Sequence, residues 1–380
     1  MSDRGIMFFM NILCISIDGL HNGMIGAFGN AWIQTSALDT LACQAVLFDR
    51  YYTDSMRLDT VFNAFWRHLA DLTDHQTVLL TDDDDVFHHA LADFSERHRL
   101  ELSKLDRPVA EVDQTQCFQA FATIIDLFEN RLKSRDKPVF LWTHLQGFRG
   151  VWDCPMDYRR QYQGDEDPEP YAGVVPPEIL VEPGKMIDPD DLQAVMETYA
   201  GGISAMDHAL TGLLDWFKES PLAVDTLLVF LSSRGFSLGE HDRIGPNEML
   251  YGENVQLPLF IRFPDGFEAA GRCNAIMTPG DLGDFLSAAT TGNKMFEDFK
   301  KLFQDATEPR RQSLFLGETG HDRALLTDEW FLRKTDDRFE LYVKPDDRWE
   351  VNDVADRCPE TAEELLTLLE SRFDRRLSEP

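Results

Sequence analysis

The stretch Leu227–His241, LLVFLSSRGFSLGEH, constrains the fold of this chain strongly. An apolar run, Thr226–Leu231, stops abruptly at Ser232-Ser233-Arg234-Gly235. This pattern predicts a buried parallel strand that ends in a glycine turn. In open α/β sheets, ligands and catalytic groups gather at such carboxyl ends of strands. We therefore expect functional residues close to the end of this strand.

Apolar runs of strand length recur along the chain and alternate with segments of helical periodicity. The expected strands are Asn11–Ile17, Val46–Tyr52, Thr77–Thr81, Pro138–Thr143 and Val255–Phe263. The expected helices are Ala37–Ala45, Gln116–Leu132 and a long helix that starts at Asp188-Pro189, with Asp as N-cap. This alternation predicts an α/β fold, a mostly parallel sheet flanked by helices on both faces.

The pattern changes near the C-terminus. From Ala324 onward, LLTDEWFLRK and FELYVK alternate between apolar and polar residues, as antiparallel strands do. Pro359–Leu377 has the periodicity of an amphipathic helix. We therefore expect two parts, an α/β domain over residues 11–320 and a small α+β subdomain over residues 321–380 that packs on it.

The charge balance limits the partners of this protein. With 36 basic and 67 acidic residues among 380, the formal net charge is -31. Such a field repels nucleic acid and anionic membrane surfaces, so neither is expected as a partner. No run reaches the roughly 18 apolar residues of a membrane span. The acidic run Asp82–Asp85 is interpreted as a solvated loop or a helix N-terminus rather than a cation site.

The cysteines indicate a reducing compartment. Six of them are scattered without CxxC pairs or a Cys/His spacing typical of metal ligands. The apolar start runs straight into the first expected strand with no cleavage site, so it does not read as a signal peptide. We expect a cytoplasmic protein that starts at Met1 or Met10.

Several of these segments together resemble the sulfatase family of the alkaline phosphatase superfamily, over about residues 11–375. In that family the strand corresponding to Thr226–Leu231 continues as Ser-Asp-His-Gly-Glu and then Leu-Gly-Glu-His, and this chain keeps the second phrase. The first strand of the family ends in two metal-binding Asp residues. Asp18 matches the first of them, and Gly19 stands at the second, as is normal in the phosphodiesterase branch of the superfamily. LYGENVQLPLFIRFP and the C-terminal FELYVKPDD also match family segments.

The resemblance implies that the nucleophile is missing. Phe48–Tyr52 matches the segment that precedes the catalytic Cys or Ser of sulfatases, and the spacing places Leu58 at that position. Ser55 or Thr60 would serve only if the loop were re-registered, and a hydroxyl needs a metal ion or an adjacent base to be activated.

The resemblance also implies that metal and substrate contacts have changed. His144 matches a substrate-side histidine, and Arg149 stands where a second histidine is expected. Ser233 and Arg234 replace the Asp and His of the metal site. Arg149 and Arg234, together with Arg243, are candidates for a basic, anion-binding pocket. We expect Asp18, His144 and Ser233 to converge at one edge of the sheet.

Two functions remain open. In the first, the chain is a sulfatase-like pseudoenzyme without a metal cofactor, which binds a protein partner or a small anion. Arg234 and Asp18 then form a buried salt bridge where the cation would lie. In the alternative, it is a hydrolase of sulfuric or phosphoric esters that binds Ca²⁺ or Mg²⁺ through Asp18, Asp54 and Asp242, with a Ser or Thr nucleophile.

Overall fold

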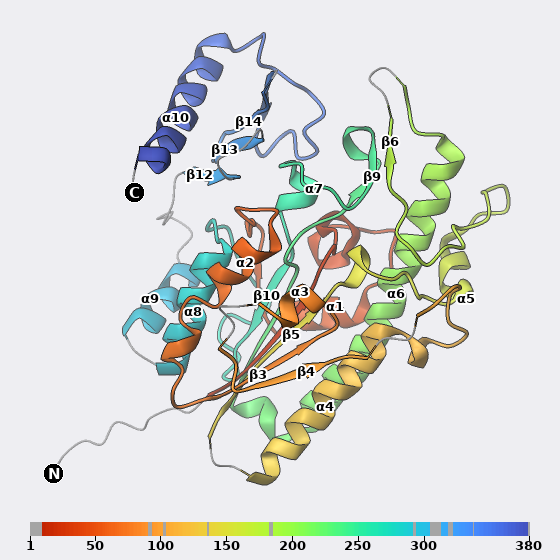
Figure 1. Ribbon diagram of the computed structural model, residues 1–380, viewed down its shortest axis with the longest axis vertical. Helices are drawn as coiled ribbons and strands as arrows, with labels where there is room; N and C mark the ends of the chain where they lie inside the picture. Colours follow the sequence, from red (N-terminus) through yellow and green to blue (C-terminus); the bar gives the residue numbers. More distant parts are fainter. Residues whose placement is uncertain are drawn as a thin grey trace.

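The computed structural model describes most of the chain, with β-sheets and helices arranged in layers (Figure 1). The described residues are 10–89, 93–101, 104–134, 137–181, 185–291, 294–304, 313–317, 322–336 and 338–378. The expected start at Met1 and the expected boundary at residues 320–321 lie outside them. Among the described residues, no helix combines the length and the apolar character needed to cross a membrane.

An eight-stranded sheet forms the centre of the molecule, in the order β11-β2-β10-β7-β1-β5-β3-β4. Five neighbouring strands, β7, β1, β5, β3 and β4, are parallel, whereas β10 is antiparallel to both β7 and β2. The strands are β1 (Asn11–Ile17), β2 (Val46–Phe48), β3 (Gln76–Thr81), β4 (Glu96–Arg99), β5 (Val139–Leu145), β7 (Thr226–Leu231), β10 (Leu259–Arg262) and β11 (Gly271–Cys273). The predicted, mostly parallel α/β sheet is confirmed.

Helices cover both faces of this sheet, and the alternation of side chains in β1 explains why. Leu13, Ile15 and Ile17 point to one side and Ile12 and Cys14 to the other, and all are buried. A strand that is apolar on both faces needs cover on both. One face carries α1 (Ser36–Ala42), α4 (Gln116–Ser134) and α6 (Pro189–Glu219), and the other carries α2 (Leu58–Phe65), α8 (Pro279–Thr291) and α9 (Lys294–Gln304).

The long helix α6 begins where the sequence predicts. The Asp188 side chain accepts a hydrogen bond of 3.0 Å from the backbone N–H of Asp190, and Pro189 occupies the first position. The apolar stripe of the helix, which includes Tyr199 and Ile203, packs onto the sheet. The Tyr199 hydroxyl donates to the backbone carbonyl of Gly19 at 2.7 Å, which places this part of α6 beside the carboxyl edge of the parallel strands.

The C-terminal part forms a four-stranded antiparallel sheet with one long helix. The elements are β12 (Ser313–Leu316), β13 (Arg323–Thr327), β14 (Trp330–Lys334), β15 (Phe339–Val343) and α10 (Pro359–Ser378). One face packs against α10 through Leu332 and Phe373, and the other contacts Tyr251 through Phe331 and Tyr342. Because β12 precedes residue 320, the small sheet begins before the expected division, which itself stays a prediction.

The remaining elements are short. They are β6 (Ile179–Leu180), β8 (Ser237–Leu238) and β9 (Arg243–Gly245), which form a three-stranded sheet, and the helices α3 (Asp84–Phe87), α5 (Met156–Arg159) and α7 (Gly252–Val255). Asp83 caps α3 by accepting from the backbone N–H of Val86 at 3.0 Å. This confirms the helix N-terminus interpretation for the end of the acidic run.

Two expected strands are shorter than the sequence suggests. Val255–Phe263 was expected as one strand, but α7 ends at Val255 and β10 begins only at Leu259, just after Pro258. Proline has no backbone N–H for a ladder, which explains why regular pairing starts after it. Likewise β2 ends at Phe48, and the remainder of Val46–Tyr52 makes only isolated bridges.

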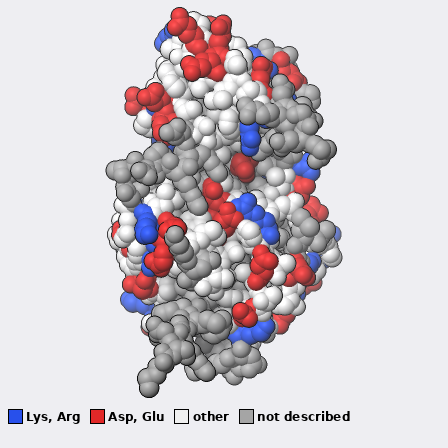
Figure 2. Space-filling model, turned by 90° about the vertical axis from the view of Figure 1, so that its left-hand side faces the viewer, with Lys and Arg blue, Asp and Glu red and all other residues white. Residues whose placement is uncertain are grey.

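The surface is acidic without being uniform. Figure 2 shows several separate groups of Asp and Glu side chains over one face, with Lys and Arg side chains between them. This distribution fits the strong negative net charge of the chain.

Candidate functional site

The residues singled out in the sequence meet at the carboxyl edge of three adjacent parallel strands. Ser16 in β1 is in register with His144 in β5 and with Leu231 in β7. The Ser16 hydroxyl lies 2.6 Å from the Ser233 hydroxyl and 3.4 Å from His144 Nδ1. The expected convergence of these strand ends is therefore confirmed, and a buried polar chain links them.

An ion pair between Asp18 and Arg234 dominates this edge. Arg234 donates from Nη2 to Asp18 Oδ2 at 2.5 Å and from Nε to the same oxygen at 3.1 Å, and Nε also lies 3.3 Å from Oδ1. The Asp18 side chain is only 2% exposed and that of Arg234 16%. The salt bridge expected between these residues is confirmed, and it closes the end of β1 onto the end of β7.

Arg149 lies on the other side of the same carboxylate. Its Nε is 4.0 Å from Asp18 Oδ2, and its Nη1 donates to the backbone carbonyl of Gly235 at 3.0 Å. Gly19 makes room for this arrangement, because a Cβ there would lie 2.8 Å from Arg149 Cγ, and its φ of +75° favours glycine. A second aspartate at position 19 would therefore collide with Arg149 where it now lies.

Burial and charge shift the protonation equilibria of this group. Burial alone would raise the pKa of Asp18, but Arg234 and Arg149 together hold that pKa below its usual value. Burial lowers the pKa of Arg149 to about 10 and that of His144 to about 4, so at neutral pH the arginine is charged and the histidine is neutral. One carboxylate thus faces two guanidinium groups, and these three side chains carry one excess positive charge.

The loop before α2 lies against the ion pair. Arg234 Nη1 is 3.5 Å from the carbonyl oxygen of Met56, and Leu58 is the first residue of α2. Leu58 has no group that attacks an ester. Ser55 is buried, and its hydroxyl accepts from the backbone N–H of Arg57 at 3.1 Å, which is a turn-stabilising contact.

Comparison with known proteins identifies the family of this chain. The model of the sulfatase family matches residues 61–292, which is more than half of the chain. The chain belongs to the sulfatase family. A curated relative, an N-acetylglucosamine-6-O-sulfatase from Bacteroides thetaiotaomicron, is 30% identical over 93 residues, and that match spans 24% of this chain and only 16% of the relative.

Solved structures share the fold over nearly the whole chain. The phosphonate monoester hydrolase of Agrobacterium radiobacter superimposes with a TM-score of 0.72 at 15% identity, covering 96% of each chain. The structure of BT4656 in complex with its substrate D-glucosamine-2-N,6-O-disulfate gives a TM-score of 0.73 at 15% identity, covering 96% of this chain and 97% of the other. At these identities the likeness shows that the chain shares the fold of these two proteins.

The metal ion implied by the resemblance does not fit the residues present. Within the part of the chain that the structure describes, no three His, Cys, Asp or Glu side chains gather as a metal site. The carboxylate of Asp18 is already engaged by Arg234, whose fixed positive charge repels a cation. A hard divalent ion needs six or more oxygen ligands, most of which would have to come from elsewhere.

Two further candidates lie elsewhere. Asp242 and Arg243 line a cavity of about 930 Å³ that also reaches Trp349 in the C-terminal part, and neither Asp18 nor Arg234 lines it. Arg149 does not line this cavity either, and an anion pocket shared by all three arginines stays a prediction. Asp54 lies in the loop before α2, where its backbone carbonyl accepts from the N–H of Gly317 at 2.9 Å.

Asp82 is a notable polar residue of this edge that sequence reasoning missed. It follows β3 directly, and its Oδ1 accepts from the backbone N–H of Gln146 at 2.8 Å. Its Oδ2 is buried and has no hydrogen-bond partner among the described residues, and burial raises the pKa of this carboxyl to about 7. One signal was available, because Asp82 is the member of the acidic run that immediately follows a buried strand.

Proposed function

We propose that this member of the sulfatase family is catalytically inactive, with the Asp18–Arg234 ion pair in the place of a metal ion. The observation that carries the proposal is the placement of the Arg234 guanidinium directly on the Asp18 carboxylate. A sulfatase-like reaction needs a cation that stabilises the oxygens of the ester and a nucleophile held in position. The positive charge of Arg234 is already compensated by the Asp18 carboxylate, so it does not replace the charge of that cation.

The missing nucleophile supports the same proposal. Leu58 stands at the start of α2, where the resemblance places the attacking residue, and its side chain is aliphatic. Catalytic groups that act as a unit also fail as a unit, so losing both metal and nucleophile removes the reaction rather than slowing it modestly. The function that remains is binding of a partner or a small anion.

The residual charge supports weak anion binding. Asp18 neutralises one of the two guanidinium groups beside it, which leaves a single positive charge in a largely buried setting. Both arginines also donate to backbone carbonyls, so they offer an anion few remaining donors. We therefore infer that sulfate or phosphate binds weakly here and is not cleaved.

The direct test is a panel of chromogenic aryl sulfates, phosphomonoesters and phosphodiesters, assayed with added Ca²⁺, Mg²⁺, Mn²⁺ or Zn²⁺. We expect no turnover above background for any substrate and metal pair. Asp18→Ala and Ser55→Ala serve as matched controls, because the alternative of a rebuilt hydrolase uses both positions. Turnover that disappears in both variants would establish the hydrolase and overturn the proposal.

A further inference from the structure

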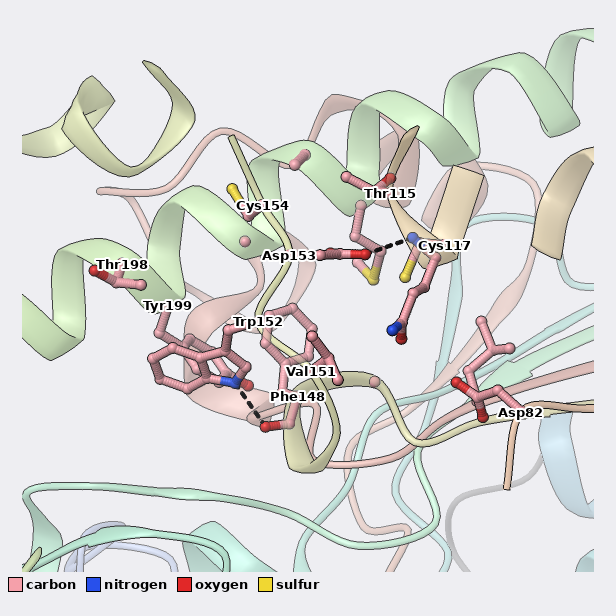
Figure 3. A pocket seen from close by; sticks show the side chains of 16 residues that line it. Asp82, Thr115, Cys117, Phe148, Val151, Trp152, Asp153, Cys154, Thr198 and Tyr199 are labelled. Carbon is pink, nitrogen blue, oxygen red and sulfur yellow. Dashed lines mark hydrogen bonds between the residues drawn. The ribbon is translucent and has the colours of Figure 1, made fainter. Parts of the chain in front are cut away.

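A small cavity lies beside the ion pair, between the start of α4, the side of α6 and the loop that follows β5. Its volume is about 40 Å³. Figure 3 shows the Asp82 carboxyl at one end, with Phe148 and Val151 between it and the rings of Trp152 and Tyr199. Neither Asp18 nor Arg234 lines this cavity, so it is separate from the site of the Asp18–Arg234 ion pair.

The lining is apolar with two acidic groups. Asp82 and Asp153 line the cavity, and of the described residues that line it none is Lys, Arg or His. The remaining titratable groups that face it are Cys117, Cys154 and Tyr199, and burial raises the pKa of each of them. These lining groups are neutral or negative, and Arg159 behind the wall lowers the pKa of Asp153 and Cys154, so the end of the cavity that suits a cation is the one at Asp82.

The carboxylates of Asp82 and Asp153 differ in the hydrogen bonds that they accept. Asp153 has a structural role, because its Oδ2 accepts from the backbone N–H of Gln116 at 2.6 Å and thereby caps α4. Asp82 is 6% exposed, and no atom in the described part of the chain forms a hydrogen bond with its Oδ2. A buried carboxylate oxygen without a donor is costly, so a donor from a ligand would relieve it.

A second orphan group lines the same cavity. The Gln116 side-chain nitrogen is also buried, and none of the residues that the structure describes accepts a hydrogen bond from it. A side-chain amide carries both a donor and an acceptor, so a half-turn of the Gln116 amide places its carbonyl oxygen at this position. A ligand that donates several hydrogen bonds would then satisfy both Asp82 and Gln116.

The volume limits the ligand. A cavity needs roughly 10–15 Å³ for each water molecule that it holds. A volume of about 40 Å³ therefore accommodates on the order of three non-hydrogen atoms. We propose that this cavity binds a short-chain primary ammonium ion of about this size, such as methylammonium or ethylammonium. Its N–H groups donate to Asp82 Oδ2, and its carbon atoms contact the apolar wall near Phe148.

The binding should depend on pH through Asp82. The ammonium ion needs the ionised carboxylate, and the pKa of Asp82 near 7 makes this form scarce at pH 6 and dominant at pH 8. Asp83 and Asp18 add negative potential at Asp82, and Asp153, whose pKa is raised to about 6, ionises in the same range. Affinity should therefore rise about tenfold from pH 6 to pH 8.

Titration of the full chain with ethylammonium chloride tests the proposal, with NaCl matched for ionic strength and with ethanol and acetate as neutral and anionic comparators. Binding is expected with a Kd on the order of a millimolar at pH 8, because so small a ligand forms few contacts. Ethanol and acetate should bind at least about tenfold more weakly. Equal binding of ethanol, or no ammonium binding at pH 8, would mean that water alone fills the cavity and would overturn the proposal.

Variants locate the site. Asp82→Asn keeps the acceptor for the backbone N–H of Gln146 and should weaken ethylammonium binding at least about tenfold. Asp85→Asn removes the same charge from an exposed position of α3 and should leave binding unchanged. Equal loss in both variants would indicate a general charge effect and would refute the site. If Asp82→Asn does not fold, the pH dependence and the preference for ammonium over acetate in the natural chain decide the question.

Discussion

Replacing Arg234 with methionine is expected to lower the free energy of unfolding by about 3–5 kcal/mol at pH 7. The change leaves the Asp18 carboxylate buried at 2% exposure without its closest cation, and Arg149 at 4.0 Å compensates only in part. Because the pKa of folded Asp18 is lowered, the pair contributes fully above the ordinary value of 3.8 and loses that contribution as the pH falls below it. Urea unfolding at neutral pH measures the loss.

A double-mutant cycle separates the pair from its surroundings. Asp18→Asn together with Arg234→Met removes both charges. The double variant should therefore lose much less stability than the summed losses of the two single variants. Arg57→Met provides a control, because the Arg57–Asp59 pair is more than half exposed on both sides and should contribute little. Strict additivity of the two single changes would show that Arg234 and Asp18 do not act as a unit.

The free energy of unfolding of Asp82→Asn, relative to that of the natural chain, is expected to be about 2–4 kcal/mol higher at pH 8 than at pH 4. Burial raises the pKa of folded Asp82 from the ordinary 3.8 to about 7, so the folded state holds a proton that the unfolded state has lost. The contribution of Asp82 to stability is therefore full below pH 3.8 and is lost as the pH rises to 7. Asparagine stays neutral and avoids this loss.

Unfolding curves at several pH values check this prediction. The difference between Asp82→Asn and the natural chain should grow between pH 4 and pH 7 and stay constant above that range. Asp85→Asn, which lies on the surface, should show no such growth. A difference that does not change with pH would mean that Asp82 is ionised in the folded state throughout and that its free oxygen is solvated.

The strand order explains why the ion pair is predictable from the sequence. Asp18 follows one buried parallel strand and Arg234 another, and β1 and β7 are neighbours in the sheet. Parallel neighbours present their carboxyl ends at one edge, so residues just beyond both ends meet. His144, at the end of β5 on the other side of β1, joins them for the same reason.

The placement of Arg243 and Asp82 depends on contacts that local patterns do not contain. Arg243 begins β9, which pairs with Leu180 in β6, a residue more than sixty positions earlier in the chain, and this pairing places it in the larger cavity. Asp82 belongs to a run of four acidic residues, a pattern that predicts a solvated segment. Its burial comes from tertiary packing: Asp82 contacts Gln146 beyond the end of β5 and lines the cavity beside the start of α4. No local sequence pattern contains these contacts.

The metal content of the purified protein tests the central claim most directly. The chain is purified without chelator, dialysed against calcium or magnesium at millimolar concentration and analysed by plasma mass spectrometry, with Asp18→Ala treated in parallel. Because Arg234 already compensates the Asp18 carboxylate, we predict far less than one equivalent of Ca, Mg, Mn or Zn in both proteins, and lower stability in Asp18→Ala. One tightly bound ion per chain that is lost in Asp18→Ala would contradict the account and would favour the metal-dependent hydrolase.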